Sequence, residues 1–403
     1  MPLACAAVIL LGAALRLYHA GDVKTRTPDE RVYTAQAGVL MDRGVAGMRA
    51  LSVEYLRDPA QRLYPPPTRI GYTGPLAAAM KLMGSRSQLV GSWISCIASI
   101  AALILATTLG YRFFHPLVGL LTAVFLSVFP PELVLARRTW QEALVNCLAL
   151  VLIYCACSIA GQPGQWRAYI WMGIAGAALL PIKESSPMIY GPCLLWAGVP
   201  LLAHRRWREF ARLMVSAVLA AGIAAAIVGW IAGGLAVEQK VLAGLFPANA
   251  SNPYALRNCT GPGYLLFAGF WTLSPAVTTL AVPGLFLALC RRARLARNPW
   301  NGTALAAFTI LFGLLPVILP HWLNLRYVSV LNAPLCLLAA IAARESWGWI
   351  RRQFTPPEIY APLTIACVAL AIAAIGDYQR FDRRFVQNET ADLAIRMVLD
   401  SPD

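Results

Sequence analysis

Apolar runs long enough to cross a lipid bilayer recur from one end of this 403-residue chain to the other. Hydrophobic residues make up 58% of the sequence and charged residues only 13%, which excludes a soluble globular protein. The sequence therefore predicts an all-α, polytopic membrane protein, with residues 1–403 forming a single integral membrane domain of about eleven transmembrane helices. These runs lie near residues 1–19, 88–110, 116–135, 143–160, 168–182, 187–203, 213–235, 263–290, 303–320, 327–343 and 360–376.

The first run has the length of a signal peptide, but it carries Arg16 and has no clear small-x-small cleavage site. We interpret it as a retained anchor. Three short loops, at residues 204–212, 291–297 and 344–352, together hold eleven Arg. All three follow even-numbered runs, so they face one side, and the positive-inside rule makes that side cytoplasmic. We therefore expect a cytoplasmic (inner) membrane protein with its N-terminus inside and its C-terminus outside.

The net charge of +15 is explained mostly by this topology, which argues against a nucleic-acid partner and leaves membrane lipids as the surroundings. Ten cysteines fall almost entirely in or at the ends of the runs, and only Cys259 lies in a predicted outer loop. There is no C-x-x-C pair and no zinc signature, so we interpret the cysteines as packing residues and predict no metal site. A requirement for a divalent cation stays open.

The first outer loop, residues 20–87, is predicted to contain two interfacial helices. Residues 28–43 carry apolar side chains at helical spacing, and a second helical segment, 70–84, follows the extended stretch Tyr64-Pro65-Pro66-Pro67. A second large outer loop covers residues 236–262, and the outer C-terminal tail covers residues 377–403.

Ionisable residues gather where four of the predicted outer loops meet the membrane. Convergence of several loops on one face is the pattern of a functional site. The residues are Asp29, Glu30, Glu132, Arg137, Arg138, Glu142, Lys183, Glu184, His321 and Arg326.

Each group also has a plainer explanation. Thr27–Glu30, with Pro28 at the first helical position, and Thr139–Glu142 both fit capping boxes. The other groups fit common features of a membrane boundary. These are lipid-headgroup anchors at Arg137-Arg138, a local ion pair at Lys183-Glu184, and an aromatic belt around His321 and Arg326.

Carboxylates beside Lys and Arg at the lipid–water boundary suit a reaction on an amphiphile with a phosphate head. A carboxylate can take the proton from an attacking hydroxyl, and the cations can hold a phosphate as it leaves. Because the outer face has no nucleotide pool, the activated group must arrive on a lipid. Glycosyl transfer from a polyprenyl-phosphate sugar meets these requirements.

Several segments resemble motifs of the GT-C membrane glycosyltransferases, with the closest likeness to the aminoarabinose transferase and protein O-mannosyltransferase (dolichyl-phosphate-mannose-type) branch. The likeness covers roughly the first 190 residues and the 316–340 region. Pro28–Tyr33 resembles the Asp-Glu-x-x-Tyr segment that opens the first outer loop. The other matching segments are the Pro-Pro stretch at Tyr64–Tyr72, the second acidic motif at Arg137–Glu142, the Lys motif at Lys183-Glu184, and the late Arg-Tyr motif at His321–Tyr327.

The resemblance implies that Asp29 is the catalytic base of an inverting, single displacement. Glu142 would orient the acceptor or assist Asp29, and Glu30 would cap or position. The donor would be a polyprenyl-phosphate-linked sugar and the acceptor a hydroxyl on a lipid, glycan or protein. The donor phosphate would be bound by Arg138, Lys183, Arg326 and His321, and the substrates would be lined by Tyr33, Tyr64, Arg137 and Tyr327.

One departure from the pattern is Tyr64, which stands where a basic residue often precedes the Pro-Pro pair, so that a phosphate contact would move to Arg62 or Arg69. Two other functions stay open. A transporter or flippase of a lipid-linked glycan also needs cations for phosphate, although charges here cluster at the ends of the runs. A non-catalytic assembly subunit would keep both the fold and the motifs.

Overall fold

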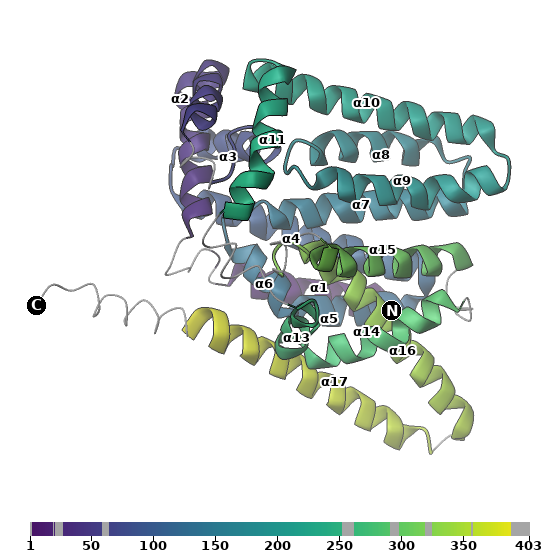
Figure 1. The fold of residues 1–403 in the computed structure, drawn as a ribbon. Helices are drawn as coiled ribbons and strands as arrows, with labels where there is room; N and C mark the ends of the chain where they lie inside the picture. Colours follow the sequence, from purple (N-terminus) through teal and green to yellow (C-terminus); the bar gives the residue numbers. More distant parts are fainter. Residues whose placement is uncertain are drawn as a thin grey trace, which may run out of the picture.

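The computed structural model describes residues 2–18, 20, 27–58, 64–251, 262–290, 298–318, 325–355 and 358–387. Within these residues the chain is helical, without strands, so the predicted all-α class is confirmed. Helices occupy every one of the eleven predicted runs (Figure 1). They are α1 (Pro2–Leu17), α4 (Gln88–Leu109), α5 (Pro116–Val128) with α6 (Pro130–Arg137), α7 (Glu142–Gly161), α8 (Trp166–Leu179), α9 (Ser186–Ala203), α10 (Trp207–Ala232), α13 (Tyr264–Leu273) with α14 (Pro275–Leu289), α15 (Pro299–Ile318), α16 (Asn332–Gln353) and α17 (Tyr360–Phe381).

Five of the helices in the described part of the chain, α4, α7, α9, α10 and α17, are long and apolar enough to cross a membrane. The pair α5 and α6 makes a sixth span if its 58° bend is counted within one crossing. Pro130 follows the bend, and a proline keeps the residue before it out of the helical region. The chain is thus a multi-pass membrane protein, and the number of eleven crossings stays a prediction.

Helices α7, α8, α9 and α10 lie side by side in one half of the molecule, and α1, α4, α5, α14 and α16 pack together in the other (Figure 1). Helix α17 runs along the outer edge, where only 6% of its apolar window is buried. Apolar side chains on such an uncovered helix suit contact with lipid tails. The nine cysteines among the described residues are free, and six are buried, as packing residues would be.

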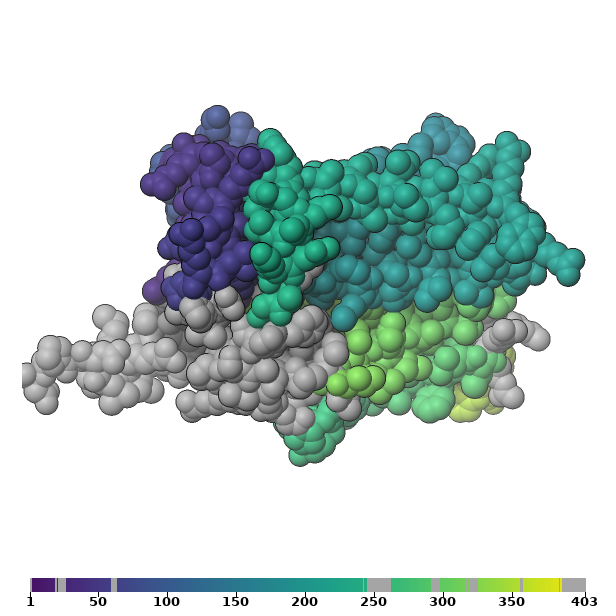
Figure 2. All heavy atoms as spheres, turned by 45° about the horizontal axis from the view of Figure 1, so that its top comes forward, coloured from purple at the N-terminus to yellow at the C-terminus, as the bar shows by residue number. Residues whose placement is uncertain are grey.

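The first predicted outer loop holds α2 (Pro28–Arg57) and α3 (Ile70–Met83). Helix α2 covers the expected segment 28–43 and continues beyond a break at Gly44, where φ is 58° and ψ −150°. A third helix, α11 (Leu235–Ser251), lies against α2 at the same end of the molecule (Figure 2). The interfacial position of these helices and the limits of the outer loops and tail stay predictions.

Candidate functional site

Glu30 is fully buried and completes the predicted capping box at the start of α2. Its Oε2 accepts a hydrogen bond from the Thr27 amide at 2.8 Å, and Pro28 occupies the first helical turn. The same carboxylate accepts from Nη1 of Arg138 at 3.2 Å and, through Oε1, from the Thr139 amide at 2.9 Å. Both oxygens of Glu30 are therefore occupied, which fits the capping and positioning role expected for this residue.

The capping box expected at Thr139–Glu142 is wrong. Helix α7 begins at Glu142 itself, and the Thr139 hydroxyl donates to the carbonyl oxygen of Gln88 on another helix. Glu142 is 2% exposed, and its side chain turns toward residues from two other segments of the chain. Its carboxylate is thus available for contacts that a capping residue would not make.

Four side chains, Asp29, Glu142, Lys183 and Arg326, form one contiguous charged cluster. Nη1 of Arg326 lies 2.6 Å from Oδ2 of Asp29, and its Nε lies 2.9 Å from Oε1 of Glu142. The same Oε1 of Glu142 accepts from Nζ of Lys183 at 3.2 Å. The side chain of Asp29 is 31% exposed, the most accessible of the four. Residues as distant in sequence as 29 and 326 therefore meet at a single point.

Aromatic rings hold the cations of the charged cluster in place. The Arg326 guanidinium lies 4.5 Å from the centroid of the Trp140 ring, and the Arg138 guanidinium lies 5.2 Å from the same ring. Nε1 of Trp140 donates to the hydroxyl of Thr27 at 3.1 Å. Nζ of Lys183 lies 4.9 Å from the centroid of the Tyr327 ring. Cation–π contacts of this kind orient the charged groups as well as stabilise them.

A second ion pair lies beside the charged cluster. Arg69 donates to both carboxylate oxygens of Glu184, at 2.9 and 2.7 Å, and to the hydroxyl of Tyr33 at 2.7 Å. Lys183 and Glu184 therefore point to different partners, and the local ion pair expected between them is wrong. The Gly71 amide donates to the Pro181 carbonyl at 3.0 Å, and a Cβ at Gly71 would lie 2.8 Å from the Ile182 nitrogen. This close approach of α3 holds the turn that carries Lys183 and Glu184.

Burial and neighbouring charges shift the pKa of three of these groups. Burial lowers the pKa of Lys183 below its usual value, against the opposing effect of Glu142. Burial alone would raise the pKa of Glu184, but the Arg69 guanidinium brings it below its usual value. Burial would likewise lower the pKa of Arg326, but Glu142 and Asp29 raise it above its usual value. The partner charges therefore favour the ionised forms of Glu184 and Arg326, whereas burial disfavours that of Lys183.

The other residues that the sequence predicted for the site lie in several different environments. Arg137 and Arg138 are 5% and 6% exposed, so their interpretation as headgroup anchors is wrong. The guanidinium of Arg137 lies 4.7 Å from the centroid of the Phe381 ring. Tyr33 is buried against Arg69, and Tyr64 is 41% exposed. His321 lies outside the described residues.

The motifs predicted no role for Trp140 or Glu184, although both residues stand in matching segments. Trp140 stands inside the Arg137–Glu142 segment, so its sequence position was a signal, but only packing shows that two guanidinia share its ring. Arg69, an alternative phosphate contact in the sequence, is held by Glu184 and Tyr33. Among the described residues there is no group of three or more His, Cys, Asp or Glu side chains suited to hold a metal ion.

Gly91 of α4 lies directly against Thr139, and we expect Gly91→Ala to loosen the site. An added Cβ would lie 2.1 Å from Cγ2 of Thr139, whose hydroxyl and amide are both hydrogen-bonded, so the side chain cannot swing aside. Overpacking of this kind costs about 1–3 kcal/mol in unfolding free energy, measurable by thermal denaturation in detergent. Gly222→Ala on α10, where the added Cβ has open space, is the control. Equal stability of the two variants would contradict the tight contact.

No protein-family model matches the sequence, and no curated protein sequence matches it. Solved structures do match. ArnT from Cupriavidus metallidurans, bound to undecaprenyl phosphate, is similar over 99% of this chain and 80% of its own, with a TM-score of 0.59 and 14% identity. Archaeal oligosaccharyltransferase AglB from Archaeoglobus fulgidus, in complex with an inhibitory peptide and a dolichol-phosphate, is similar over 94% of this chain and 55% of its own, with a TM-score of 0.57 and 14% identity.

The chain has the GT-C fold. ArnT and AglB are both GT-C glycosyltransferases, so the fold implied by the short sequence motifs is confirmed. The chain spans only about 55% of the length of AglB. At 14% identity the likeness concerns the fold, and the chemistry of the charged cluster has to be argued from its own residues.

Proposed function

We propose that this protein is a GT-C-type glycosyltransferase that moves a sugar from a polyprenyl-phosphate donor to an acceptor hydroxyl on a lipid, glycan or protein. The reaction would take place on the outer face of the cytoplasmic membrane. One observation carries the proposal: two carboxylates and two cations from four distant segments meet in the charged cluster. Support for the donor class comes from the ArnT and AglB structures, which contain undecaprenyl phosphate and a dolichol-phosphate.

Asp29 is the proposed base because it is the most accessible carboxylate of the cluster. It would take the proton of the acceptor hydroxyl as the new bond forms between the acceptor oxygen and the anomeric carbon. The bond from that carbon to the phosphate oxygen breaks in the same step, and the polyprenyl phosphate leaves with its electron pair. A single displacement of this kind inverts the anomeric centre.

Arg326 and Lys183 are the proposed partners of the donor phosphate, since both already converge on one oxygen of Glu142. Glu142 would hold the two cations at the spacing that the phosphate needs. The Arg138 guanidinium donates to Glu30 and packs on the same Trp140 ring as Arg326. We therefore assign Arg138 a positioning role rather than direct phosphate contact.

The formal charges of the site balance before substrate arrives. Four carboxylates (Asp29, Glu30, Glu142 and Glu184) face four cations (Arg69, Arg138, Lys183 and Arg326). A donor phosphate adds negative charge and competes with Asp29 for Arg326. Loss of that contact would leave Asp29 without an ion-pair partner among the described residues, so that its carboxylate could accept the proton of the acceptor hydroxyl. A divalent cation entering with the donor is the alternative way to balance the charge.

The proposal is tested with the full chain in lipid nanodiscs, supplied with polyprenyl-phosphate hexoses, pentoses and amino sugars and a membrane-extract acceptor. We expect release of polyprenyl phosphate from at least one donor, dependent on acceptor and detected by mass spectrometry, with an inverted anomeric centre in the product. Movement of the intact donor between the leaflets of proteoliposomes, without cleavage, would instead identify a flippase. Binding of the donors without cleavage or movement would identify a non-catalytic subunit.

A further inference from the structure

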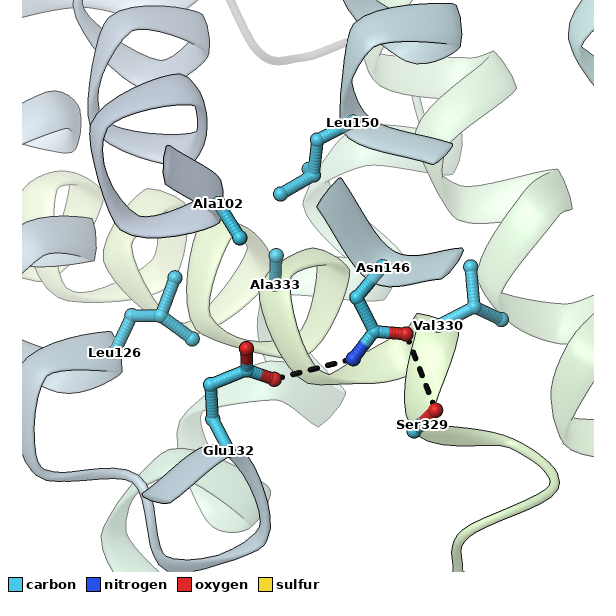
Figure 3. Close-up of a pocket in the computed structure, with 8 residues that line it drawn as sticks. All are labelled: Ala102, Leu126, Glu132, Asn146, Leu150, Ser329, Val330 and Ala333. Atoms are coloured by element: carbon cyan, nitrogen blue, oxygen red, sulfur yellow. Dashed lines mark hydrogen bonds between the residues drawn. The ribbon is translucent and has the colours of Figure 1, made fainter. Parts of the chain in front are cut away.

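A buried carboxylate outside the charged cluster, Glu132 on α6, collects hydrogen bonds from three other helices. It is 2% exposed. Its Oε1 accepts from the Ser99 hydroxyl of α4 at 3.0 Å. Its Oε2 accepts from the amide nitrogens of Asn146 on α7, at 3.2 Å, and Asn332 on α16, at 2.9 Å (Figure 3 shows the bond to Asn146). Four helices thus meet at one side chain.

Arg16 is hydrogen-bonded to the same Ser99 hydroxyl as this carboxylate. Its Nε donates to the Ser99 hydroxyl at 2.8 Å, and its other nitrogens donate to main-chain oxygens, including that of Leu126 at 2.9 Å. The Arg16 guanidinium and the Glu132 carboxylate are therefore connected through the Ser99 hydroxyl. Burying a carboxylate that has only hydrogen bonds and an indirect cation is less favourable than packing an apolar side chain of similar volume. Simple core packing does not explain a glutamate at this position.

The hydrogen bonds of Glu132 lead to the charged cluster by two routes. Asn146 lies one helical turn after Glu142 on α7, so the two side chains share a face of that helix. The Ser329 hydroxyl, three residues after Arg326, donates to Oδ1 of Asn146 at 3.1 Å (Figure 3). Asn332, which begins α16, fixes the far end of the same segment. The two stretches that carry Glu142 and Arg326 are therefore connected through Glu132.

A small cavity lies at this junction. Glu132, Asn146 and Ser329 line its polar side, and Ala102, Leu126, Leu150, Val330 and Ala333 line the rest (Figure 3). Apolar walls on this side of the junction lower the local dielectric, which strengthens the hydrogen bonds beside them.

We propose that Glu132 is a positioning residue, which sets the place of the turn carrying Arg326 against the start of α7. Its effect on turnover rests on the proposed transferase function, whereas its effect on the turn does not. A misplacement of about 1 Å in a site of this kind lowers turnover by about a hundredfold. Loss of Glu132 would therefore impair the charged cluster without removing any of its members.

Hydrogen exchange of the full chain in nanodiscs tests the positioning role directly. The readout is the amide of Leu331, which donates to the Val328 carbonyl at 2.9 Å in the turn after Arg326. Glu132→Met keeps the length of the side chain and removes both acceptors, and we expect exchange at this amide to rise by about tenfold. Glu132→Gln keeps one oxygen for Asn146 and Asn332, so it should restore most of the protection.

Ser329→Ala is a milder variant that removes only the bond to Asn146, and it keeps the test available if Glu132→Met does not fold. We expect about a fivefold rise in exchange at Leu331 and a fall in kcat larger than any change in KM. The control is Asn301→Leu on α15, a buried residue that accepts from Nε1 of Trp196 at 3.3 Å, elsewhere in the fold. This variant should lose stability and leave the Leu331 amide unchanged.

Unchanged exchange at Leu331 in Ser329→Ala and Glu132→Met, or an equal rise in Asn301→Leu, would overturn the positioning role. The outcome does not depend on activity. Raised exchange in a protein that never cleaves a donor would refute the proposed function and leave the positioning role intact. Normal turnover with raised exchange would show that the turn moves without affecting the reaction, and would overturn the catalytic part of the inference.

Discussion

Replacing Asp29 with Asn will lower the rate of sugar transfer by about 10²- to 10⁴-fold, the range expected when a general base is removed. The amide keeps the size of the carboxylate, and its oxygen can still accept from Arg326, now at 2.6 Å from the Asp29 carboxylate. It cannot take a proton from the acceptor hydroxyl. Folding and donor binding should therefore survive while the chemical step is lost.

The measurement is the initial rate of polyprenyl phosphate release in nanodiscs, together with the dissociation constant for polyprenyl phosphate and a thermal melt. Asp42→Asn is the matched control. Asp42 lies on the same helix, α2, in an exposed ion pair with Arg86 at 2.7 Å, and its loss should leave the rate unchanged. Near-normal turnover of Asp29→Asn would remove Asp29 from the mechanism, whatever the fate of the other residues.

Replacing Arg326 with Gln will weaken both the fold and donor binding. The arginine is the only residue of the charged cluster that contacts both Asp29 and Glu142, and its side chain is 17% exposed. Breaking a buried ion pair by removing one partner costs about 3–5 kcal/mol, because the remaining charge stays buried. Glu142, 2% exposed, would keep only Lys183 as an ion-pair partner among the described contacts.

We expect a clear fall in melting temperature for Arg326→Gln. Added polyprenyl phosphate should stabilise wild type, and this stabilisation should disappear in the variant. Arg326→Lys keeps the charge but offers a single ammonium for two carboxylates, so its effect should be intermediate. Arg86→Gln breaks the exposed pair with Asp42 and should change the free energy of unfolding by at most about 1 kcal/mol. Full stabilisation of Arg326→Gln by the lipid phosphate would place the phosphate elsewhere.

Much of the architecture could be predicted from the sequence, because the formation of membrane helices depends on local sequence patterns. Apolar runs of sufficient length predicted a helix in each of the eleven segments, and all are helical. The capping box at Thr27–Glu30 was readable for the same reason, since it depends on residues three apart. That cap separates Glu30, turned inward, from Asp29, which is partly exposed.

Predictions from neighbouring residues were wrong where a side chain contacts a partner that is distant in the sequence. The Thr139–Glu142 pattern matches a capping box, yet Glu142 pairs with Lys183 and Arg326. Lys183 and Glu184 are neighbours in sequence and bind to different segments. Arg137 and Arg138 are adjacent too, but one contacts Phe381 and the other Glu30. No spacing rule distinguishes the members of such pairs.

The sequence by itself determined the helical runs, the cap at the start of α2 and the set of charged residues, because helix formation and capping depend on neighbours within one turn. Only the tertiary structure decided which charges meet, because the contact between Asp29 and Arg326 spans 297 positions. Glu132 illustrates the difference most clearly. Its sequence position marks it as one more membrane-edge carboxylate, and only the packing of α4, α6, α7 and α16 brings it three donors. Hydrogen bonds and ion pairs depend on distances of a few ångströms, and in a helical membrane protein those distances are set by how the helices pack.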